Sequence, residues 1–456
     1  MAGKDFDAII VGAGFAGLYM LHKLRGLGLT ARVFEAGADV GGTWYWNRYP
    51  GARCDVESME YSFSFDEALE QEWSWTERYA TQPEILCYAR HVADRFDLRR
   101  DISFSTRVTT ATFDEADGLW RVETDSGERL TARFCVMATG CLSTPNRPDI
   151  RGLDEFEGSL YQTGLWPHEG VDFTGQRVAV IGTGSSAIQS IPVIARQAAQ
   201  LTVFQRTANY VAPAHNHPMS AEYETSFKAD YRALRRKQLE GYFGALAHRE
   251  MSPLPATAVS EAERDEFYEG GWRHGGLGIL GSYPDLLFDP AANETLAEFV
   301  RGKIREIVRD PETAELLCPN DHPVGSKRMC IDTGYFETFN RDNVTLVDLK
   351  AEPIERITPT GIATAKREFA FDAIVLATGF DAMTGTLAKI AITGRGGRTL
   401  SAEWATGTVA SLGLMVEGFP HLLLITGPGS PAADRKSTRL NSSHITTSYA
   451  VFCLKK

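Results

Sequence analysis

The stretch Phe6-Asp-Ala-Ile-Ile-Val11-Gly12-Ala-Gly14-Phe-Ala-Gly17 decides the fold of this 456-residue chain. Residues 6–11 are a short apolar run, typical of a buried strand. The glycines after it permit a tight turn and a close approach of the backbone to a ligand, and a helix is expected up to Leu27. A second apolar strand, residues 31–34, ends at Glu35. This order predicts a dinucleotide-binding unit.

The same pattern returns 170 residues later. Residues 178–181 are an expected strand, residues 201–204 are its partner, and the glycine turn between them reads Gly182-Thr183-Gly184-Ser185-Ser186-Ala187. The two copies align without a gap from their first glycine to the end of the second strand. Two copies at matched spacing are far more specific than a lone glycine motif, so two dinucleotide-binding units are predicted.

The two copies differ where their second strand ends. Glu35 closes the first copy, and a carboxylate there can accept hydrogen bonds from a ribose diol. The second copy has Gln205 at that place, followed by Arg206 and Thr207. Loss of the acid removes repulsion toward a 2′-phosphate, which an arginine can bind. The first copy therefore predicts FAD and the second NADPH; taken alone, Arg206 is also compatible with an ordinary surface charge.

The organisation around the copies predicts an α/β fold of two nested, Rossmann-like dinucleotide-binding domains. Two Ala-Thr-Gly stretches, 138–140 and 377–379, each follow an apolar strand (134–137 and 373–376) and are expected where the chain crosses between the domains. The expected segments are a FAD domain in two parts (1–141 and 380–433), an NADPH domain (142–379) with a mostly helical insertion at about 220–311, and a non-native, Ser/Thr-rich tail (434–456). Arg235-Arg236-Lys237 is expected to lie on a solvated helix face.

Composition narrows the class of protein. The net charge of −12 does not favour binding to nucleic acids or to anionic membranes. No apolar run is long enough to span a membrane. Seven scattered cysteines without a C-x-x-C pair fit the reducing cytoplasm. His215 and His217 lack an evident third ligand, so no metal is expected.

Two longer motifs indicate a family. The first is Gly41-Gly-Thr43-Trp44, continuing to Tyr49-Pro-Gly-Ala-Arg53-Cys54-Asp55; the second is Phe156-x-Gly158-x(3)-Gln162-x(3)-Trp166-Pro167. On these stretches the sequence resembles the Baeyer–Villiger monooxygenases, over essentially residues 5–433, and looks closest to the phenylacetone monooxygenases. The resemblance implies that NADPH reduces FAD, that reduced flavin and O2 form a peroxyflavin, and that this inserts oxygen beside a ketone carbonyl to give an ester or lactone.

The resemblance also implies site residues. Arg328 matches the catalytic arginine, which stabilises anionic oxygen, and Asp55 matches the carboxylate that pairs with it. Lys327 matches a contact to the NADPH 2′-phosphate, beside Arg206 and Thr207. The full set expected to bind the two cofactors is Gly12, Gly14, Phe15, Ala16, Gly17, Glu35, Thr43, Trp44, Tyr45, Trp46, Arg53, Cys54, Asp55, Tyr61, Val108, Gly182, Thr183, Gly184, Ser185, Ser186, Ala187, Gln189, Arg206, Thr207, Lys327 and Arg328. Trp44, Trp46 and Trp166 are open to plain core packing as well.

The chain departs from the family pattern at two places. Gln162 stands where the family has a histidine, and glutamine cannot titrate near neutral pH, so the fold is expected to persist with weakened turnover. Family members also continue past the equivalent of Pro431, so a truncated chain is expected.

Three alternatives stay open. A flavin-dependent disulfide reductase needs a close cysteine pair after the first glycine motif, where only Cys54 stands. A flavin monooxygenase acting on amines or sulfides shares part of the second motif. A non-catalytic nucleotide-binding remnant is favoured by Gln162 and by the early end of the chain.

Overall fold

The computed structural model describes residues 3–240, 250–382 and 384–430, which fall into two compact units. The first unit comprises the described residues within 1–47, 83–145 and 380–456, and the second those within 48–82 and 146–379. Residues 48–82, expected in the first domain, therefore cluster with the second unit. The assignment of each unit to one dinucleotide stays a prediction. The expected tail, 434–456, lies outside the described residues.

The first unit is built on an eight-stranded sheet in the order β17-β4-β5-β6-β1-β2-β3, with β18 also paired to β6. Strand β1 lies between β2 and β6 and is parallel to both, with Ile10 opposite Val33 and Val136. The apolar runs form these central strands because both faces of an inner parallel strand are buried. The strands are β1 Phe6–Val11, β2 Ala31–Phe34, β3 Ile102–Ser103, β4 Val108–Asp114, β5 Leu119–Thr124, β6 Arg129–Met137, β17 Ala391–Thr393 and β18 Leu422–Leu424. The helices and turns of 3-10 helix are α1 Phe15–Gly26, α2 Thr43–Trp46, α4 Gln82–Arg95, α12 Gly385–Ala388, α13 Leu400–Glu403, η1 Arg99–Asp101 and η6 Arg395–Gly397.

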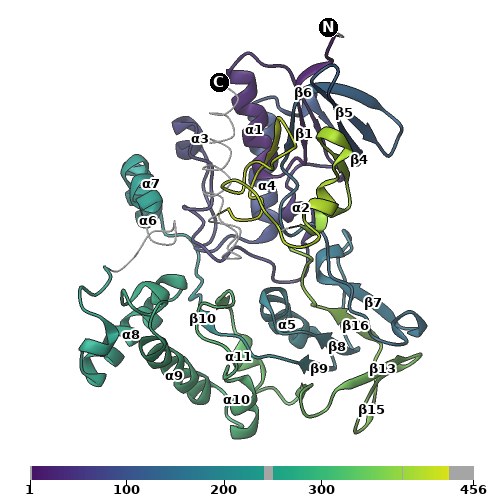
Figure 1. Cartoon of the computed structure of the whole chain (residues 1–456). Helices are drawn as coiled ribbons and strands as arrows, with labels where there is room; N and C mark the ends of the chain where they lie inside the picture. The colour runs from purple at the N-terminus through teal and green to yellow at the C-terminus, as the bar shows by residue number, and fades with distance from the viewer. Residues whose placement is uncertain (1–2, 241–249, 383, 431–456) are drawn as a thin grey trace. The chain divides into compact units, whose positions relative to one another are not determined.

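The second unit contains a parallel five-stranded sheet in the order β12-β9-β8-β16-β7. Helix α5 packs against β8 and β9 and covers part of this sheet (Figure 1). The strands expected at 178–181, 201–204 and 373–376 are present as β8, β9 and β16. The strands of this unit are β7 Ser159–Gln162, β8 Arg177–Ile181, β9 Gln200–Gln205, β10 Val211–Pro213, β11 Cys330–Asp332, β12 Val344–Asp348, β13 Ile354–Thr358, β14 Gly361–Thr364, β15 Glu368–Ala370 and β16 Ala373–Leu376.

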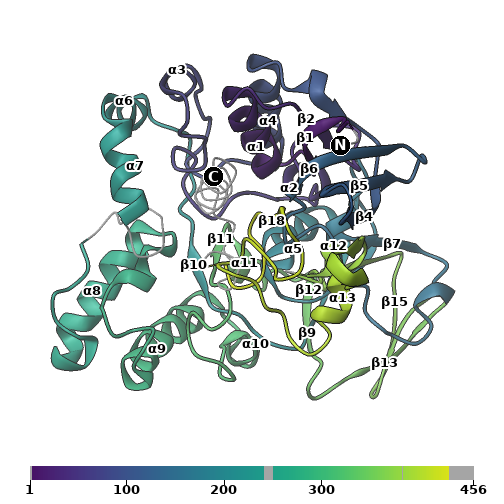
Figure 2. The same ribbon diagram turned by 45° about the horizontal axis from the view of Figure 1, so that its top comes forward.

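Helices dominate the middle of the second unit. The helical region extends beyond its expected end at about residue 311, since α10 ends at Leu317. Helix α8 lies beside α9, as the views in Figures 1 and 2 agree. The helices and 3-10 turns of this unit are α3 Glu67–Glu72, α5 Ser185–Gln197, α6 Ala221–Ala229, α7 Tyr231–Glu240, α8 Glu261–His274, α9 Pro290–Ile307, α10 Pro311–Leu317, α11 Tyr335–Thr338, η2 Leu153–Glu155, η3 Thr163–Leu165, η4 Ala256–Ala258 and η5 Leu277–Gly281.

One expectation about α7 is wrong. Arg235 is not solvated but only 8% exposed, and it forms an ion pair with Glu70 at 2.9 Å. Its guanidinium also donates to the carbonyl of Glu60 at 2.9 Å. The neighbouring Arg236 and Lys237 are exposed, as expected. A buried guanidinium needs such partners, and here a segment some 165 residues away supplies them.

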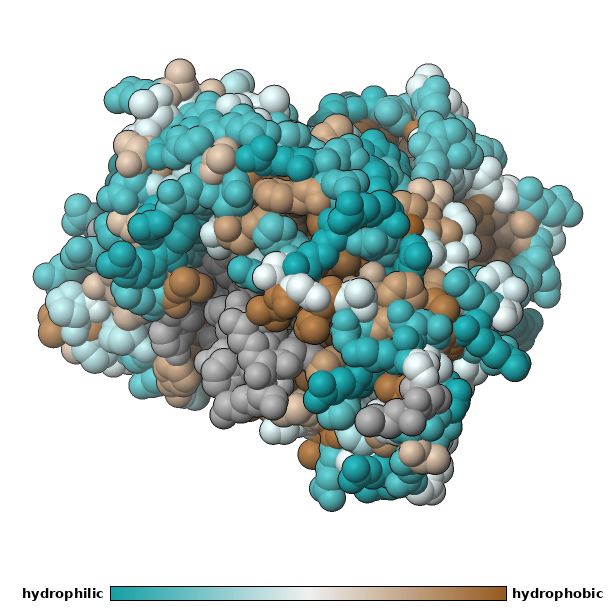
Figure 3. Space-filling model, turned by 90° about the horizontal axis from the view of Figure 1, so that it is seen from above, coloured by the Kyte–Doolittle hydropathy of each residue, from teal (hydrophilic) through white to brown (hydrophobic). Residues whose placement is uncertain are grey.

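Hydrophilic residues cover most of the surface visible in Figure 3, with apolar residues scattered among them. Some apolar surface remains exposed on every folded protein. Among the described residues no helix combines the length and the apolar character that crossing a membrane requires.

Candidate functional site

Both predicted glycine turns form a cradle in front of a helix N-terminus. Gly12 has φ +105°, and an added Cβ would lie 2.5 Å from the carbonyl oxygen of Ala138. Gly182 repeats this geometry with φ +117° and 2.5 Å to the carbonyl oxygen of Ala377. In each unit, the carbonyl of the first residue of the Ala-Thr-Gly stretch thus lies against the glycine turn. Only glycine tolerates this close approach together with a positive φ.

The helices that start in these cradles are suited to a phosphate group. Gly14 and Gly184 are the N-caps of α1 and α5, and neither helix has a side-chain cap or an acidic residue in its first turn. An added Cβ at Gly184 would meet nothing within 4 Å, so the backbone there faces open space. Uncapped N-terminal amides and the helix dipole together favour an anion. The residues present therefore fit the pyrophosphate of a dinucleotide in each unit.

Glu35 occupies the end of β2 as a buried carboxylate, 5% exposed. It accepts backbone hydrogen bonds from Ala13 and Gly37, each at 2.7 Å. Burial raises the pKa of Glu35, while these two amides and the charge of Arg107 act against the rise. The Trp46 side chain, from α2, also hydrogen bonds this carboxylate. Each carboxylate oxygen has more than one acceptor position, so capacity for a ribose diol remains.

The corresponding strand end in the second unit carries no carboxylate. Gln205 turns toward α10 and donates to the carbonyl of Leu316 at 2.6 Å. Arg206 is exposed, and the Thr183 hydroxyl donates to the carbonyl of Thr207 at 2.7 Å. An exposed guanidinium in place of an acid fits a nucleotide with a 2′-phosphate.

Arg328 and Asp55, 273 residues apart in sequence, form an ion pair through Arg328 Nη2 and Asp55 Oδ2. The Asp55 side chain is 4% exposed and that of Arg328 20%. Burial acts to lower the pKa of Arg328, but the Asp55 charge and its hydrogen bond raise it overall, so the guanidinium stays cationic. Lys327, next to it in the chain, is exposed.

Gln189 joins this pair from helix α5. Its Nε2 donates to Asp55 Oδ1 and to the carbonyl of Arg53, both at 3.1 Å. The structure thus brings Arg53, Asp55, Gln189 and Arg328, four predicted site residues, into one cluster. Cys54, between two of them, is buried, and burial raises the pKa of its thiol.

Two members of the cluster were missing from the predicted set. Tyr49 donates its hydroxyl to Gln189 Oε1 at 2.9 Å, and Cys330 Sγ lies 3.0 Å from Ser185 Oγ. Gly51, in the same sequence motif as Tyr49, could have indicated this loop as part of the site. It has φ +81°, and an added Cβ would lie 2.3 Å from the carbonyl oxygen of Gln189. The glycine after Tyr49-Pro50 is thus required by the close packing of this loop on α5.

Other predicted residues are placed on other elements. Thr43, Trp44, Tyr45 and Trp46 form α2 of the first unit, and Val108 starts β4 there. Tyr61 is buried in the second unit, where its backbone amide donates to the carbonyl of Glu57 at 3.1 Å.

Gln162 ends β7 opposite Leu376 of β16. Its Nε2 is buried and has no hydrogen-bond partner within the part of the chain that the structure describes. The adjacent Thr163 hydroxyl lies 3.1 Å from that of Ser186, in the second glycine motif. Trp166 is 4% exposed and packs on Tyr161 with ring centroids 5.5 Å apart, so it belongs to the core of the second unit.

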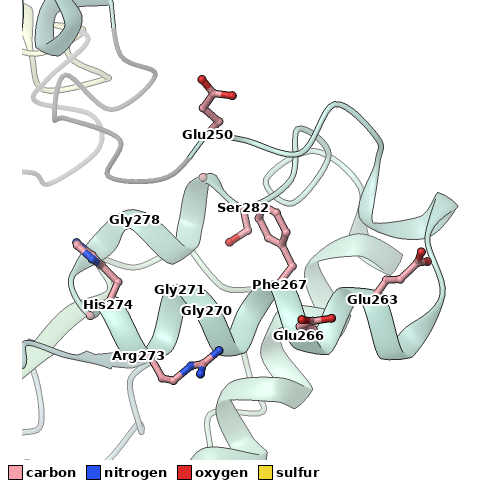
Figure 4. A pocket seen from close by; sticks show the side chains of 12 residues that line it. Glu250, Glu263, Glu266, Phe267, Gly270, Gly271, Arg273, His274, Gly278 and Ser282 are labelled. Atoms are coloured by element: carbon pink, nitrogen blue, oxygen red, sulfur yellow. The ribbon is translucent and has the colours of Figure 1, made fainter.

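A separate cavity of about 570 Å³ lies at α8 and η5 of the second unit. Figure 4 shows Phe267, Gly270 and Gly271 on α8 along one side of it, with the side chain of Ser282 facing Phe267. Glu263 and Glu266 also line it. No predicted cofactor residue is among the lining residues, so this cavity is distinct from the two cradles.

Two cradles, each a strand, a glycine turn and a helix, define an oxidoreductase class with two dinucleotide-binding units. A family profile described as "Pyridine nucleotide-disulphide oxidoreductase" matches residues 9–245. The solved structures are similar over nearly the whole chain. A structure described as oxidized steroid monooxygenase bound to NADP has 54% identity and a TM-score of 0.94, covering 99% of this chain and 85% of that one. A crystal structure described as OTEMO in complex with FAD and NADP has 42% identity and a TM-score of 0.95, covering 99% and 86%.

A curated relative gives the narrower grouping. The protein named Baeyer-Villiger monooxygenase from Pseudooceanicola batsensis is 45% identical over 433 residues, which are 94% of this chain and 78% of the relative. The chain belongs to the Baeyer–Villiger monooxygenase family. The family resemblance and the α/β fold predicted from the sequence are thereby confirmed, while the closer affinity to phenylacetone monooxygenases stays a prediction.

Proposed function

We propose that this chain is an NADPH- and FAD-dependent Baeyer–Villiger monooxygenase that converts a ketone and O2 into an ester or lactone. The observation that carries the proposal is the Arg328–Asp55 ion pair, whose carboxylate is buried and hydrogen bonded to the helix that starts in the second cradle. When bound, FAD supplies the redox chemistry that activates O2 with electrons taken from NADPH.

The chain's own residues bind and orient the two cofactors. The amides at the start of α1 and α5 hold the pyrophosphates, and Glu35 accepts hydrogen bonds from the ribose of FAD. Arg206, Thr207 and Lys327 bind the 2′-phosphate of NADPH, since two cations and a hydroxyl match its charge and acceptor oxygens.

Arg328 stabilises the anionic oxygen that develops during oxygen insertion. A guanidinium keeps its proton at any working pH and offers a planar set of donors. Asp55 orients it and offsets the cost of burying a cation. A fixed donor in a site with little water stabilises developing charge more than water does.

The test is product analysis with the purified chain, FAD, NADPH and a set of linear and cyclic ketones under isotopically labelled O2. One labelled oxygen atom in an ester or lactone is the expected result. Oxidised amines or sulfides with no ester from any ketone would support a nitrogen- or sulfur-oxygenating enzyme instead.

Gln162, in place of the family histidine, favours a second candidate function, a nucleotide-binding protein without turnover. This candidate function predicts that the purified chain binds NADPH and consumes none of it in the presence of O2. Yellow protein that consumes NADPH with O2 excludes this candidate.

The reducing cytoplasm remains the compartment that we propose, from the cysteine pattern.

A further inference from the structure

Gln189 makes four hydrogen bonds, and all of them go to the loop that carries Asp55. Its Nε2 donates to Asp55 Oδ1 and the Arg53 carbonyl, and its Oε1 accepts from the Tyr49 hydroxyl at 2.9 Å and the Arg53 amide at 3.4 Å. A primary amide has two donors and two acceptor positions. Gln189 is 5% exposed, and its side chain has no hydrogen-bond donor or acceptor position left for a nucleotide.

The Asp55 carboxylate is shared between two partners. Oδ1 accepts from Gln189, while Oδ2 accepts from Arg328. A carboxylate with both oxygens engaged has little freedom to rotate away from the guanidinium. The amide of Gln189 therefore sets the direction from which Asp55 meets Arg328.

Helix α5 also reaches the Arg328 side of the pair. Ser185, four residues before Gln189 and so on the same helix face, contacts Cys330, two residues after Arg328. Asn209 donates to the carbonyl of Arg328 at 3.1 Å. Helix α5 thus carries the predicted pyrophosphate cradle at its N-terminus, where Ser185 contacts Cys330, and one turn later it bonds to Asp55 through Gln189.

We infer that Gln189 is a positioning residue, rather than a nucleotide ligand, that holds Asp55 so that Arg328 stays in its working orientation. The expected effect of Gln189 on ester formation rests on the proposed function. Its effect on the position of Asp55 does not depend on that function. The Gly51 contact on α5 shows that the loop is packed too closely to find another partner without moving.

Two substitutions separate the roles. Gln189→Leu keeps most of the volume and removes every hydrogen bond. Gln189→Glu places a carboxylate against Asp55, which repels it when ionised and donates to it when protonated. Gln197→Glu, at the exposed end of the same helix, is the matched control for the added charge.

The groups around position 189 permit a clear pH test. The titratable and charged groups that face it are Tyr49, Arg53, Cys54, Asp55, Arg328 and Cys330. Burial raises the pKa of the Cys330 thiol to about 12, and it raises the pKa values of Tyr49 and Cys54 as well. The Tyr49 hydroxyl and the two thiols therefore stay protonated across neutral pH, so they add no transition there beside that of the introduced glutamate.

For Gln189→Leu we expect NADPH to bind within about threefold of the parent while ester yield per NADPH falls about tenfold or more, because a buried hydrogen bond to a charge is lost. For Gln189→Glu we expect the loss at pH 8 and recovery as the pH falls to about 6, since burial beside a carboxylate raises a glutamate pKa. A loss of NADPH affinity that parallels the loss of ester, or pH profiles shaped like that of the parent, would overturn the inference.

Crystal structures of the parent, Gln189→Leu and Gln197→Glu give a readout that needs no activity. We expect the Asp55–Arg328 ion pair to form in the parent and the control and to be broken in Gln189→Leu; an intact ion pair in Gln189→Leu overturns the positioning role. A parent that makes no ester, together with an ion pair broken only in Gln189→Leu, refutes the proposed function and leaves the positioning role supported. Melting temperatures of all three proteins identify a variant that fails to fold, in which case Gln189→Glu is crystallised at pH 8 in place of Gln189→Leu.

Discussion

The two cradles share a backbone and differ in what lies around them. Gly12 and Gly182 approach the carbonyls of Ala138 and Ala377 at the same 2.5 Å. Beyond the turn, the first copy presents the buried carboxylate of Glu35, and the second presents the exposed Arg206. A repeated backbone thus fits a pyrophosphate at two places, and the side chains beyond each turn are predicted to decide which dinucleotide each place takes.

The second cradle has a further feature: its helix bonds to the buried carboxylate of an ion pair. The α5 residue Gln189 bonds to Asp55, whose other oxygen meets Arg328. In the second copy, the helix that follows the glycine turn also bonds to the carboxylate of an ion pair, and the cation of that pair is the predicted catalytic residue.

The largest expected effect is at that cation. Arg328→Ala should lower ester formation at least about a hundredfold, because a fixed donor to developing negative charge is lost. NADPH consumption should continue with release of hydrogen peroxide, measured by a peroxide assay beside product analysis. Arg328→Lys keeps the charge without the planar guanidinium, so its ester formation should lie between that of the parent and that of Arg328→Ala. Arg236→Ala, an exposed change on α7, is the control, and ester formation within threefold of the parent for Arg328→Ala would contradict the role.

The shared backbone predicts matched losses at the two glycines. Gly12→Ala and Gly182→Ala should each lower the free energy of unfolding by about 2–3 kcal/mol, since a positive φ and a carbonyl clash both oppose a Cβ. Gly170→Ala, with φ +80° and nothing within 4 Å of an added Cβ, isolates the backbone strain at about 1 kcal/mol. Denaturant unfolding measures the loss, and equal values for Gly170 and Gly182 would show that the carbonyl contact contributes nothing.

The strand ends should be separable by cofactor. Arg206→Ala should raise the KM for NADPH about tenfold and leave that for NADH nearly unchanged, because one charged contact to the 2′-phosphate is lost. Glu35→Gln should weaken FAD retention by a similar factor without changing the preference between NADPH and NADH. Equal losses with both nicotinamide cofactors in Arg206→Ala would make it a general charge effect.

The smallest effect is expected at Gln162. Gln162→His should raise coupled turnover several-fold, since a titratable ring replaces an amide whose Nε2 has no partner within the described residues. Ester yield per NADPH, followed from pH 6 to pH 9, is the measurement. An unchanged yield at every pH would mean that the glutamine is tolerated.

The local parts of this picture were predictable. The strands at 6–11 and 31–34 and their second copies follow from short apolar runs and glycine spacing, which act over a few residues. Arg328 and Asp55 were selected by family motifs, and the structure pairs them. Their catalytic roles remain predictions.

Other parts had no local signal. Arg235 looked solvated because its partner Glu70 lies 165 positions away, and residues 48–82 carry no mark of the unit they join. The motif of Gln189 gave no sign of the four hydrogen bonds that its side chain makes to a loop more than 130 residues distant.

The sequence by itself determined that this protein has two dinucleotide cradles with different strand ends, because apolar periodicity, glycine turns and single charges are local properties. Only the tertiary structure decided which polar side chains share a buried cluster. The physical reason is that a buried charge persists only where partners converge on it, and folding brings those partners from distant segments.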